Sequence, residues 1–279
     1  MHIPAFDNHN QAIVDRDDQD VPLCYFNIVK LNKGESFTSQ VDGYETCLVP
    51  ATGSIDVSVG GQIFDAVGKR NHIWEGDPEG VYVPIGMAAE MTCVSDEVEV
   101  FVAGAQHDEV YEPFVVRESD IDPVQYGSDD TKTHRKIKHI LGKEPAGKVG
   151  RLLVSELFTV GAGGWSGFPP HKHDTDHLPD ESRHDEVYNF RFNPDHGFGA
   201  QFMTPEGKDM GEVYHIRNGS TIKIESGYHP CVAAPGYEMY YFTVLGGLSQ
   251  RPLHQHFHPD YAYQLKTIPG IMDMVNKFK

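Results

Sequence analysis

The sequence predicts an all-β chain built as two tandem β-barrels, followed by a short helical tail. Glycine (28 residues) and proline (18 residues) are abundant in the 279-residue chain, and short apolar segments lie between them. Many short strands separated by turn residues are typical of sandwiches and barrels. An internal repeat indicates that one barrel design occurs twice. Helical periodicity is missing until the C-terminus.

The predicted strands are short and rich in β-branched and aromatic residues, and turn residues bound each of them. They include residues 61–64, 81–84, 98–102, 151–154 and 239–244. From Pro259 onward the pattern favours one or two short helices, interrupted at Pro269 and Gly270.

The repeat relates two halves of the chain at an offset of 141 residues. Residues 81–88 can be laid on residues 222–229, and both are followed by a strand that ends in small residues. Glu45 matches Glu186, since each precedes a repeated glycine by 41 residues. Two barrels of one design are therefore the simplest interpretation.

The charge balance excludes some classes of partner. Lysine and arginine number 23 against 41 aspartates and glutamates, which gives a net charge of −18. Nucleic acids and anionic membranes attract basic surfaces, so neither is expected to bind. The one basic stretch, residues 132–143, has apolar residues at alternate places and predicts a strand with a solvated face.

The termini and cysteines predict a cytoplasmic protein. The N-terminus has neither a basic start nor an apolar run, so no signal peptide is predicted, and no apolar window is long enough for a membrane span. The cysteines lack metal-site spacing and predict reduced thiols in the core: Cys24, Cys47, Cys93 and Cys231.

Four residues predict a metal site: His171, His173, Glu186 and His229. Two histidines one residue apart on a strand face the same side, about 7 Å apart. Glu186 directly precedes an apolar strand, which we expect to pair with the strand of the histidines; Glu181 is a rival ligand. Three imidazoles and a carboxylate suit a divalent first-row metal and leave positions open for substrate.

The other histidines of this region are predicted to play no part in metal binding. Three lie in a polar loop or a turn and are expected to be solvated: His177, His184 and His196. Three more alternate along one segment, but only Asp260 lies near them, so no second metal is expected: His254, His256 and His258.

The repeat indicates that only one barrel carries a site. Ala88 stands where the second half has His229, and no pair of histidines precedes Glu45. The first barrel is therefore a structural partner. The predicted division is a degenerate N-terminal lobe at 1–105, a connection at 106–147 and a metal-binding lobe at 148–279.

Four segments carry a family resemblance: residues 164–174, 186–192, 197–201 and 227–237. They resemble the 5-deoxy-glucuronate isomerase family of myo-inositol catabolism, a bicupin family related to the 5-keto-4-deoxyuronate isomerases. The resemblance is strongest from Arg135 to Arg251 and consistent in layout over the first lobe. It implies a bicupin fold of two tandem cupin-type barrels, with His171, His173, Glu186 and His229 as metal ligands.

The resemblance also implies an aldose–ketose isomerisation, from 5-deoxy-D-glucuronate to 5-dehydro-2-deoxy-D-gluconate. A divalent metal that holds the carbonyl oxygen and the neighbouring hydroxyl would stabilise the enediolate while a base moves one proton. No redox step is required, so zinc is adequate, and manganese or iron would also serve. The sequence does not identify the proton shuttle.

The substrate carboxylate requires a cation, and Arg191 is the first candidate, with Lys172 and Arg251 as alternatives. Strict alternation would nevertheless face Arg191 away from Glu186. Further candidates for the pocket wall are Tyr188, Gln201, Tyr237 and Tyr241.

Three other functions remain as alternatives. They are a 5-keto-4-deoxyuronate isomerase, an iron-dependent cupin dioxygenase and a non-enzymatic sugar-binding cupin. The expected partners are a small sugar-acid substrate and further copies of the chain in a homo-oligomer.

Overall fold

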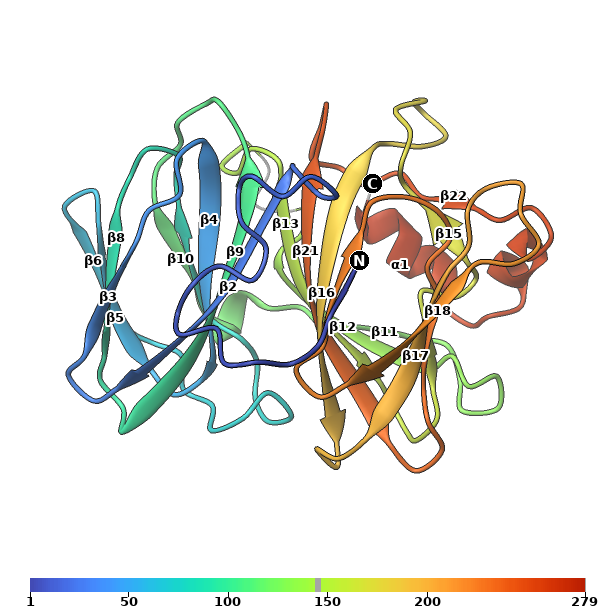
Figure 1. Cartoon of the computed structure of the whole chain (residues 1–279), viewed down its shortest axis with the longest axis horizontal. Coiled ribbons are helices and arrows are strands. Elements are labelled where there is room, and N and C mark those ends of the chain that lie inside the picture. Colours follow the sequence, from blue (N-terminus) through green and yellow to red (C-terminus); the bar gives the residue numbers. More distant parts are fainter. Residues whose placement is uncertain (144–146, 279) are drawn as a thin grey trace.

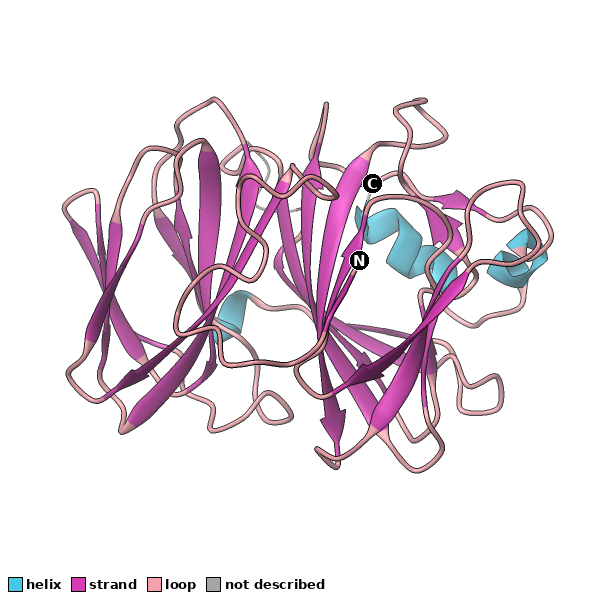
Figure 2. Cartoon of the chain, viewed as in Figure 1, coloured by secondary structure: helices cyan, strands magenta, loops and turns pink. Residues whose placement is uncertain are grey.

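Short alternating strands build two β-barrels that lie side by side (Figures 1 and 2). The computed structural model describes residues 1–143 and 147–278. None of the helices in this part of the chain is long and apolar enough to cross a membrane. The helical elements are short, and two of them form the predicted C-terminal tail: η1 (Glu118–Asp120), η2 (Ala262–Lys266) and α1 (Ile271–Phe278).

The first barrel consists of two antiparallel sheets. The larger sheet contains β10 (Phe114–Val116), β7 (Gly80–Val83), β4 (Tyr44–Thr52), β9 (Glu97–Gln106) and β2 (Cys24–Asn32). The smaller sheet contains β3 (Ser36–Ser39), β8 (Ala89–Cys93), β5 (Ile55–Val59) and β6 (Gln62–Val67).

The second barrel repeats this plan with a wider sheet and an added two-stranded ribbon. The wide sheet contains β1 (His2–Ile3), β19 (Thr221–Ile224), β16 (His184–Asn193), β21 (Glu238–Gly247), β13 (Leu152–Thr159), β12 (Arg135–Leu141) and β11 (Val124–Tyr126). Facing it are β14 (Trp165–Ser166), β20 (Cys231–Ala233), β17 (Phe198–Met203) and β18 (Glu212–Arg217). The ribbon pairs β15 (His171–Lys172) with β22 (His256–Phe257).

The two large sheets pack against each other and also line their own barrels. Along β21, Tyr241 and Leu245 belong to the core of the second barrel, whereas Tyr240 and Phe242 belong to the core between the barrels. This division follows the period of two along a strand. The rings of Phe242 and Phe101 lie 4.7 Å apart across the junction. The buried junction therefore holds the two barrels together as one unit.

The structure confirms the repeat and corrects its register at one strand. β9 and β21 begin and end 141 residues apart, as do β7 and β19. In β16, however, Glu186 pairs with Leu245, whose counterpart Gly104 pairs with Thr46. The match of Glu45 with Glu186 is therefore wrong, because a slip of one residue moves a side chain to the opposite face of the sheet.

The true counterpart of Glu45 is Asp185, and each of them binds the start of a strand in the other barrel. A carboxylate oxygen of Glu45 accepts a hydrogen bond of 2.8 Å from the backbone N–H of Leu152, where β13 begins. Asp185 accepts one of 3.0 Å from the N–H of Leu23, just before β2. Glu45 also accepts a hydrogen bond from Tyr82 at 2.5 Å. The repeated carboxylates thus connect the barrels reciprocally.

Replacing Glu45 with glutamine is expected to lower the free energy of unfolding by about 2 kcal/mol, because charged acceptors form the stronger hydrogen bonds. Urea unfolding followed by tryptophan fluorescence measures the change. The matched control is Glu90→Gln on β8, where the side chain is exposed, and a change of about 0.5 kcal/mol or less is expected there. Equal effects for the two variants would contradict the connecting role of Glu45.

The segment predicted as a connection contributes strands to both barrels. β10 pairs with β7 of the first barrel, whereas β11 and β12 extend the wide sheet of the second. Residues 144–146 of this predicted segment lie outside the described part of the chain. The chain also begins beside the second barrel, where β1 pairs with β19 (Figure 1). The lobe boundaries at 1–105 and 148–279 stay a prediction.

The prediction of free core thiols is confirmed. All four cysteines are buried and none forms a disulfide: Cys24, Cys47, Cys93 and Cys231. Burial raises the pKa of the Cys24 thiol, so that it stays protonated and packs as a small apolar group.

Candidate metal centre

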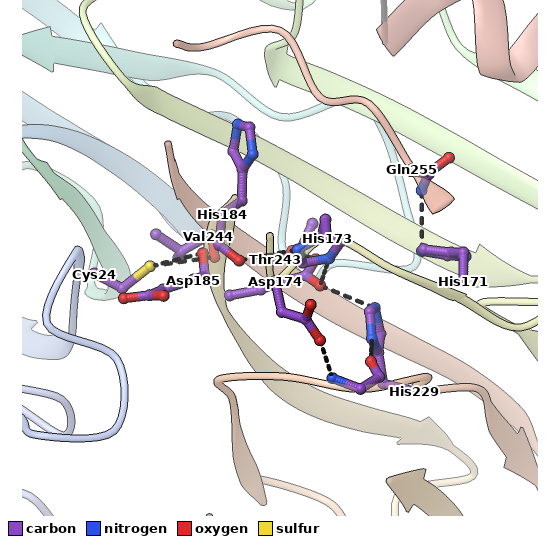
Figure 3. Close-up of polar contacts among 12 residues, drawn as sticks. Cys24, His171, His173, Asp174, His184, Asp185, His229, Thr243, Val244 and Gln255 are labelled. Carbon is purple, nitrogen blue, oxygen red and sulfur yellow. Dashed lines mark hydrogen bonds and ion pairs between the residues drawn. The ribbon is translucent and has the colours of Figure 1, made fainter. Parts of the chain in front are cut away.

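Three imidazoles converge inside the second barrel, as the sequence predicts (Figure 3). His171 and His173 lie on and just after β15, and His229 follows the turn at Gly227, whose φ of 86° favours glycine. One nitrogen of each ring lies within 4.8 Å of the others. His173 and His229 are buried, while His171 is partly exposed. The three rings thus form one face of a potential coordination shell.

Hydrogen bonds to the backbone fix how these rings present their nitrogens. The Nδ1 atom of His173 lies 2.9 Å from a carbonyl oxygen, and that of His229 lies 2.8 Å from another. A carbonyl only accepts, so Nδ1 carries a proton and Nε2 is the nitrogen available to a metal. Gln255 donates to Nε2 of His171 at 2.9 Å, and Nε2 of His229 is buried with no hydrogen-bond partner among the described residues. This orientation is typical of metal-binding histidines.

Glu186 supplies a carboxylate to the same point. Its Oε2 lies 3.2 Å from Nε2 of His173 and 3.4 Å from Nε2 of His229, and its Oε1 accepts a 2.6 Å hydrogen bond from Thr243. Burial opposes the charge on Glu186, but the two imidazoles outweigh it and lower the pKa of the carboxyl. The ionised carboxylate and the Nε2 atoms of the two rings therefore meet at one point, where a cation can replace the proton shared between His173 and Glu186. The donor set therefore fits a divalent metal.

Lys172 supports the centre from the opposite side of the strand. Its Nζ donates to Glu181 and to Asp174, each at 2.8 Å. Asp174 in turn accepts a 2.8 Å hydrogen bond from the N–H of Gly227, which ties the His171 segment to the turn before His229. Lys172 and the rival ligand Glu181 form an ion pair with each other. Neither side chain therefore points toward the imidazoles.

Two predicted pocket residues, Gln201 and Tyr237, lie outside the pocket. Gln201 donates from Nε2 to the carbonyl of His229 at 2.7 Å and holds that turn in place. Tyr237 lies with its ring 5.4 Å from His196 and 6.1 Å from Phe198. Neither is among the described residues that line the pocket beside the imidazoles.

Arg191 points toward the junction between the barrels. Its guanidinium donates to Glu99 of β9 at 2.9 Å and lies 5.3 Å from the ring centroid of Phe101. Alternation along β16 explains this, because Glu186 and Arg191 are an odd number of positions apart. Arg251, the other alternative, donates to the backbone carbonyls of the loop at Gly142.

Replacing Arg191 with methionine is expected to leave the KM for the substrate within about twofold of the wild-type value, because the side chain lies outside the pocket. Steady-state kinetics on the metal-loaded protein measures this. A tenfold increase in KM at unchanged metal content would instead place Arg191 in the substrate site.

The pocket beside the donors combines phenols with an apolar wall. Tyr188 and Tyr241 line it as predicted, with ring centroids 4.3 Å apart. Burial raises the pKa of both phenols, so they stay protonated at neutral pH and can donate hydrogen bonds. Apolar side chains that limit access of water complete the wall: Phe168, Leu245, Leu253, Phe257 and Met274.

The pocket also contains residues that the sequence analysis does not predict. For one of them, Arg135, the sequence pattern does indicate a buried position. The basic stretch forms a strand, β12, as predicted. The prediction that one face of this strand is solvated is wrong, because Arg135 and Lys138 are buried. Arg135 shares the parity of Ile137, so alternation places it on the apolar face. The other unpredicted polar side chains of the wall are Tyr126, Thr243 and Gln255.

The structure also corrects two local predictions. His184 is buried, and its Nε2 lies 3.1 Å from the carbonyl oxygen of Arg251; burial and the nearby His173 lower its pKa to about 4. The strand of His171 pairs with β22, whereas the strand of Glu186 pairs with β19 and β21. The exposed positions predicted for His177 and His196 are confirmed.

Two barrels of one design, with imidazoles and a carboxylate inside the second, define a bicupin. Solved structures agree on the fold: an oxalate decarboxylase of Lactobacillus farciminis aligns over 99% of this chain and 93% of its own, with a TM-score of 0.68 at 10% identity. An IolB-like protein of Salmonella typhimurium LT2 aligns over 94% of this chain and 98% of its own, with a TM-score of 0.87 at 27% identity.

The sequence model of the KduI/IolB family matches residues 2–264, and the chain belongs to this family. A 5-deoxy-glucuronate isomerase of Geobacillus kaustophilus (strain HTA426) is 33% identical over 244 residues, which cover 87% of this chain and 86% of that protein. A protein of the same name from Geobacillus thermodenitrificans (strain NG80-2) is 34% identical over 224 residues, or 80% of this chain and 79% of its own.

Proposed function

We propose that this chain is an aldose–ketose isomerase that converts 5-deoxy-D-glucuronate to 5-dehydro-2-deoxy-D-gluconate, a step of myo-inositol catabolism. The convergence of three imidazoles and Glu186, beside a pocket that His171, His173 and Glu186 line, is the observation that carries the proposal. Membership of the KduI/IolB family and the relatives of this name over most of the chain support it.

His171, His173, Glu186 and His229 would hold a divalent metal, with zinc as the expected ion. Manganese and iron share its preference for imidazole and carboxylate donors. When bound, such an ion supplies a Lewis acid that polarises the substrate carbonyl and lowers the barrier to moving a neighbouring proton. The reaction changes no overall oxidation state, so nicotinamide, oxygen and phosphate are not required.

The pocket residues of the chain would bind the sugar hydroxyls and limit access of water. Tyr188 and Tyr241 carry neutral phenols that can donate to hydroxyl oxygens of a sugar chain. The Gln255 amide, which lies 2.9 Å from Nε2 of His171, can turn to a substrate hydroxyl when that nitrogen holds the metal. Phe168 and Phe257 cover the imidazoles and limit access of water, which strengthens the polar interactions inside.

Two further features stay predictions. We expect the enzyme to act in the cytoplasm and to form a homo-oligomer. Light scattering on the purified protein would determine the number of copies.

Nuclear magnetic resonance tests the proposed reaction. Purified protein with one equivalent of zinc should convert 5-deoxy-D-glucuronate to the ketose, without nicotinamide, oxygen or phosphate. A parallel assay with 5-keto-4-deoxyuronate should be slower, and an oxygen electrode should record no consumption. Absence of turnover of 5-deoxy-D-glucuronate would overturn the proposal, and oxygen-dependent turnover would indicate a dioxygenase.

A further inference from the structure

A buried arginine in the pocket wall lacks an anionic partner. Arg135 is only 2% exposed, and it lines the same pocket as the imidazoles. Its Nε donates to the carbonyl of Phe158 at 3.3 Å and its Nη2 to the phenol of Tyr241 at 3.1 Å. Among the residues that the structure describes, none accepts a hydrogen bond from its Nη1, and no carboxylate pairs with it.

This arrangement differs from that of two other arginines in the fold. Arg70 forms an ion pair with Glu156 at 2.5 Å, and Arg191 forms one with Glu99 at 2.9 Å. A guanidinium does not lose its proton at accessible pH, so burial cannot neutralise Arg135. An unpaired charge away from water is unfavourable, and a carboxylate that arrives in the pocket would remove that cost.

The surroundings of Arg135 hold its guanidinium in a defined orientation. Tyr241 accepts from Arg135, so its own O–H is free to donate to Ser166, with which it forms a short hydrogen bond. The guanidinium carbon lies 6.0 Å from the ring centroid of Tyr126 and 5.8 Å from that of Tyr241. Such faces stabilise a cation without neutralising it. The charge therefore remains available for a ligand.

The spacing between Arg135 and the metal donors matches the length of a sugar acid. On β21, Tyr241 contacts Arg135 and Thr243 contacts Glu186, and both side chains face the pocket. Residues two apart on a strand lie about 7 Å from each other along it. An extended six-carbon acid has a comparable length, so one molecule can reach both groups.

We propose that Arg135 binds the carboxylate of the substrate while the imidazole end of the pocket receives the aldehyde. The inference rests on the proposed isomerase function, because 5-deoxy-D-glucuronate carries its carboxylate and its reacting carbons at opposite ends. Arg135 thereby selects acids over neutral sugars and sets which end of the chain meets the metal donors. Tyr241 and Ser166 act as positioning residues for its guanidinium.

Binding to the metal-stripped protein tests this assignment without turnover. The ligands are 5-deoxy-D-glucuronate and 5-deoxy-D-glucose, which carries a hydroxymethyl group in place of the carboxylate. Calorimetry or ligand-detected nuclear magnetic resonance gives the two affinities. We expect the wild type to bind the acid at least about tenfold more tightly than the neutral sugar, because charge-assisted bidentate contacts are the strong ones.

The Arg135→Met variant should lose this preference, whereas Arg135→Lys should keep part of it and Arg191→Met should keep all of it. With metal restored to the wild-type level, Arg135→Met should raise the KM for the acid about 100-fold. Retention of the acid preference in a folded Arg135→Met variant would overturn the assignment. If that variant does not fold, a wild type with no preference for the acid would overturn it equally.

The two proposals can fail separately. Loss of the acid preference in Arg135→Met, with no turnover by the wild type, would overturn the reaction but support the anion site. Turnover by the wild type, with the acid preference unchanged in Arg135→Met, would support the reaction and overturn the anion site.

Discussion

Replacing His173 with alanine removes the bound metal and lowers kcat by about 1,000-fold or more, because a Lewis acid supplies several kcal/mol to the reaction barrier. His173 is buried beside two other donors, with Glu186 at 3.2 Å and the ring centroid of His229 at 4.9 Å. Metal analysis and the isomerase assay on the same preparation measure both effects.

The matched control is His177→Ala, an exposed histidine in the same segment of the chain. It should keep both the metal and the wild-type turnover. Wild-type turnover in His173→Ala, or equal loss in the two variants, would contradict the assignment of His173 as a ligand.

Replacing Arg70 with methionine should lower the free energy of unfolding by about 3–5 kcal/mol, because it leaves a buried carboxylate without its cation. Arg70 belongs to the first barrel and donates to Glu156 of β13 in the second, at 2.5 and 2.9 Å. Tyr240 donates to the same carboxylate at 3.0 Å. Chemical unfolding measures the loss, and the pair is thus expected to stabilise the junction.

An exposed ion pair provides the comparison. Arg16 contacts Asp42 at 3.1 Å with its side chain 46% exposed, and Arg16→Met should cost no more than about 1 kcal/mol. The double variant Arg70→Met with Glu156→Leu should recover most of the loss, since it removes the uncompensated charge. An effect of Arg70→Met no larger than that of Arg16→Met would contradict the role of the pair in the junction.

The fold was predictable because its signals are local and repeated. Short alternating segments between glycines and prolines indicated strands, and an offset of 141 residues indicated two barrels of one design. The alignment of β4 with β16, its counterpart in the repeat, was not predictable to the residue, because the two halves share few identical residues. Residue type and spacing favour Glu186 as the counterpart of Glu45, but the pairing of the strands makes Asp185 its counterpart.

The metal donors were predictable because their residue types and spacing are those of a metal site. Two histidines share one face of a strand, a carboxylate precedes a strand, and a histidine follows a glycine turn. The sequence does not predict Arg135 in the site, because charged residues in a strand usually face water. Its position on the face of Ile137 was visible in the sequence, but only the fold shows that this face lines the pocket. Arg191 has the positive charge that the substrate carboxylate requires. It lies an odd number of positions from Glu186, however, so its side chain is on the opposite face of β16.

Restoring metal to the stripped protein is the decisive measurement. Zinc is added in known fractions of an equivalent, and the rate of conversion of 5-deoxy-D-glucuronate is followed by nuclear magnetic resonance. We expect the rate to be near zero without metal, to rise in proportion to the metal added and to reach a plateau at one equivalent per chain. Full turnover by the stripped protein, or a rate independent of added metal, would contradict a metal-assisted isomerase.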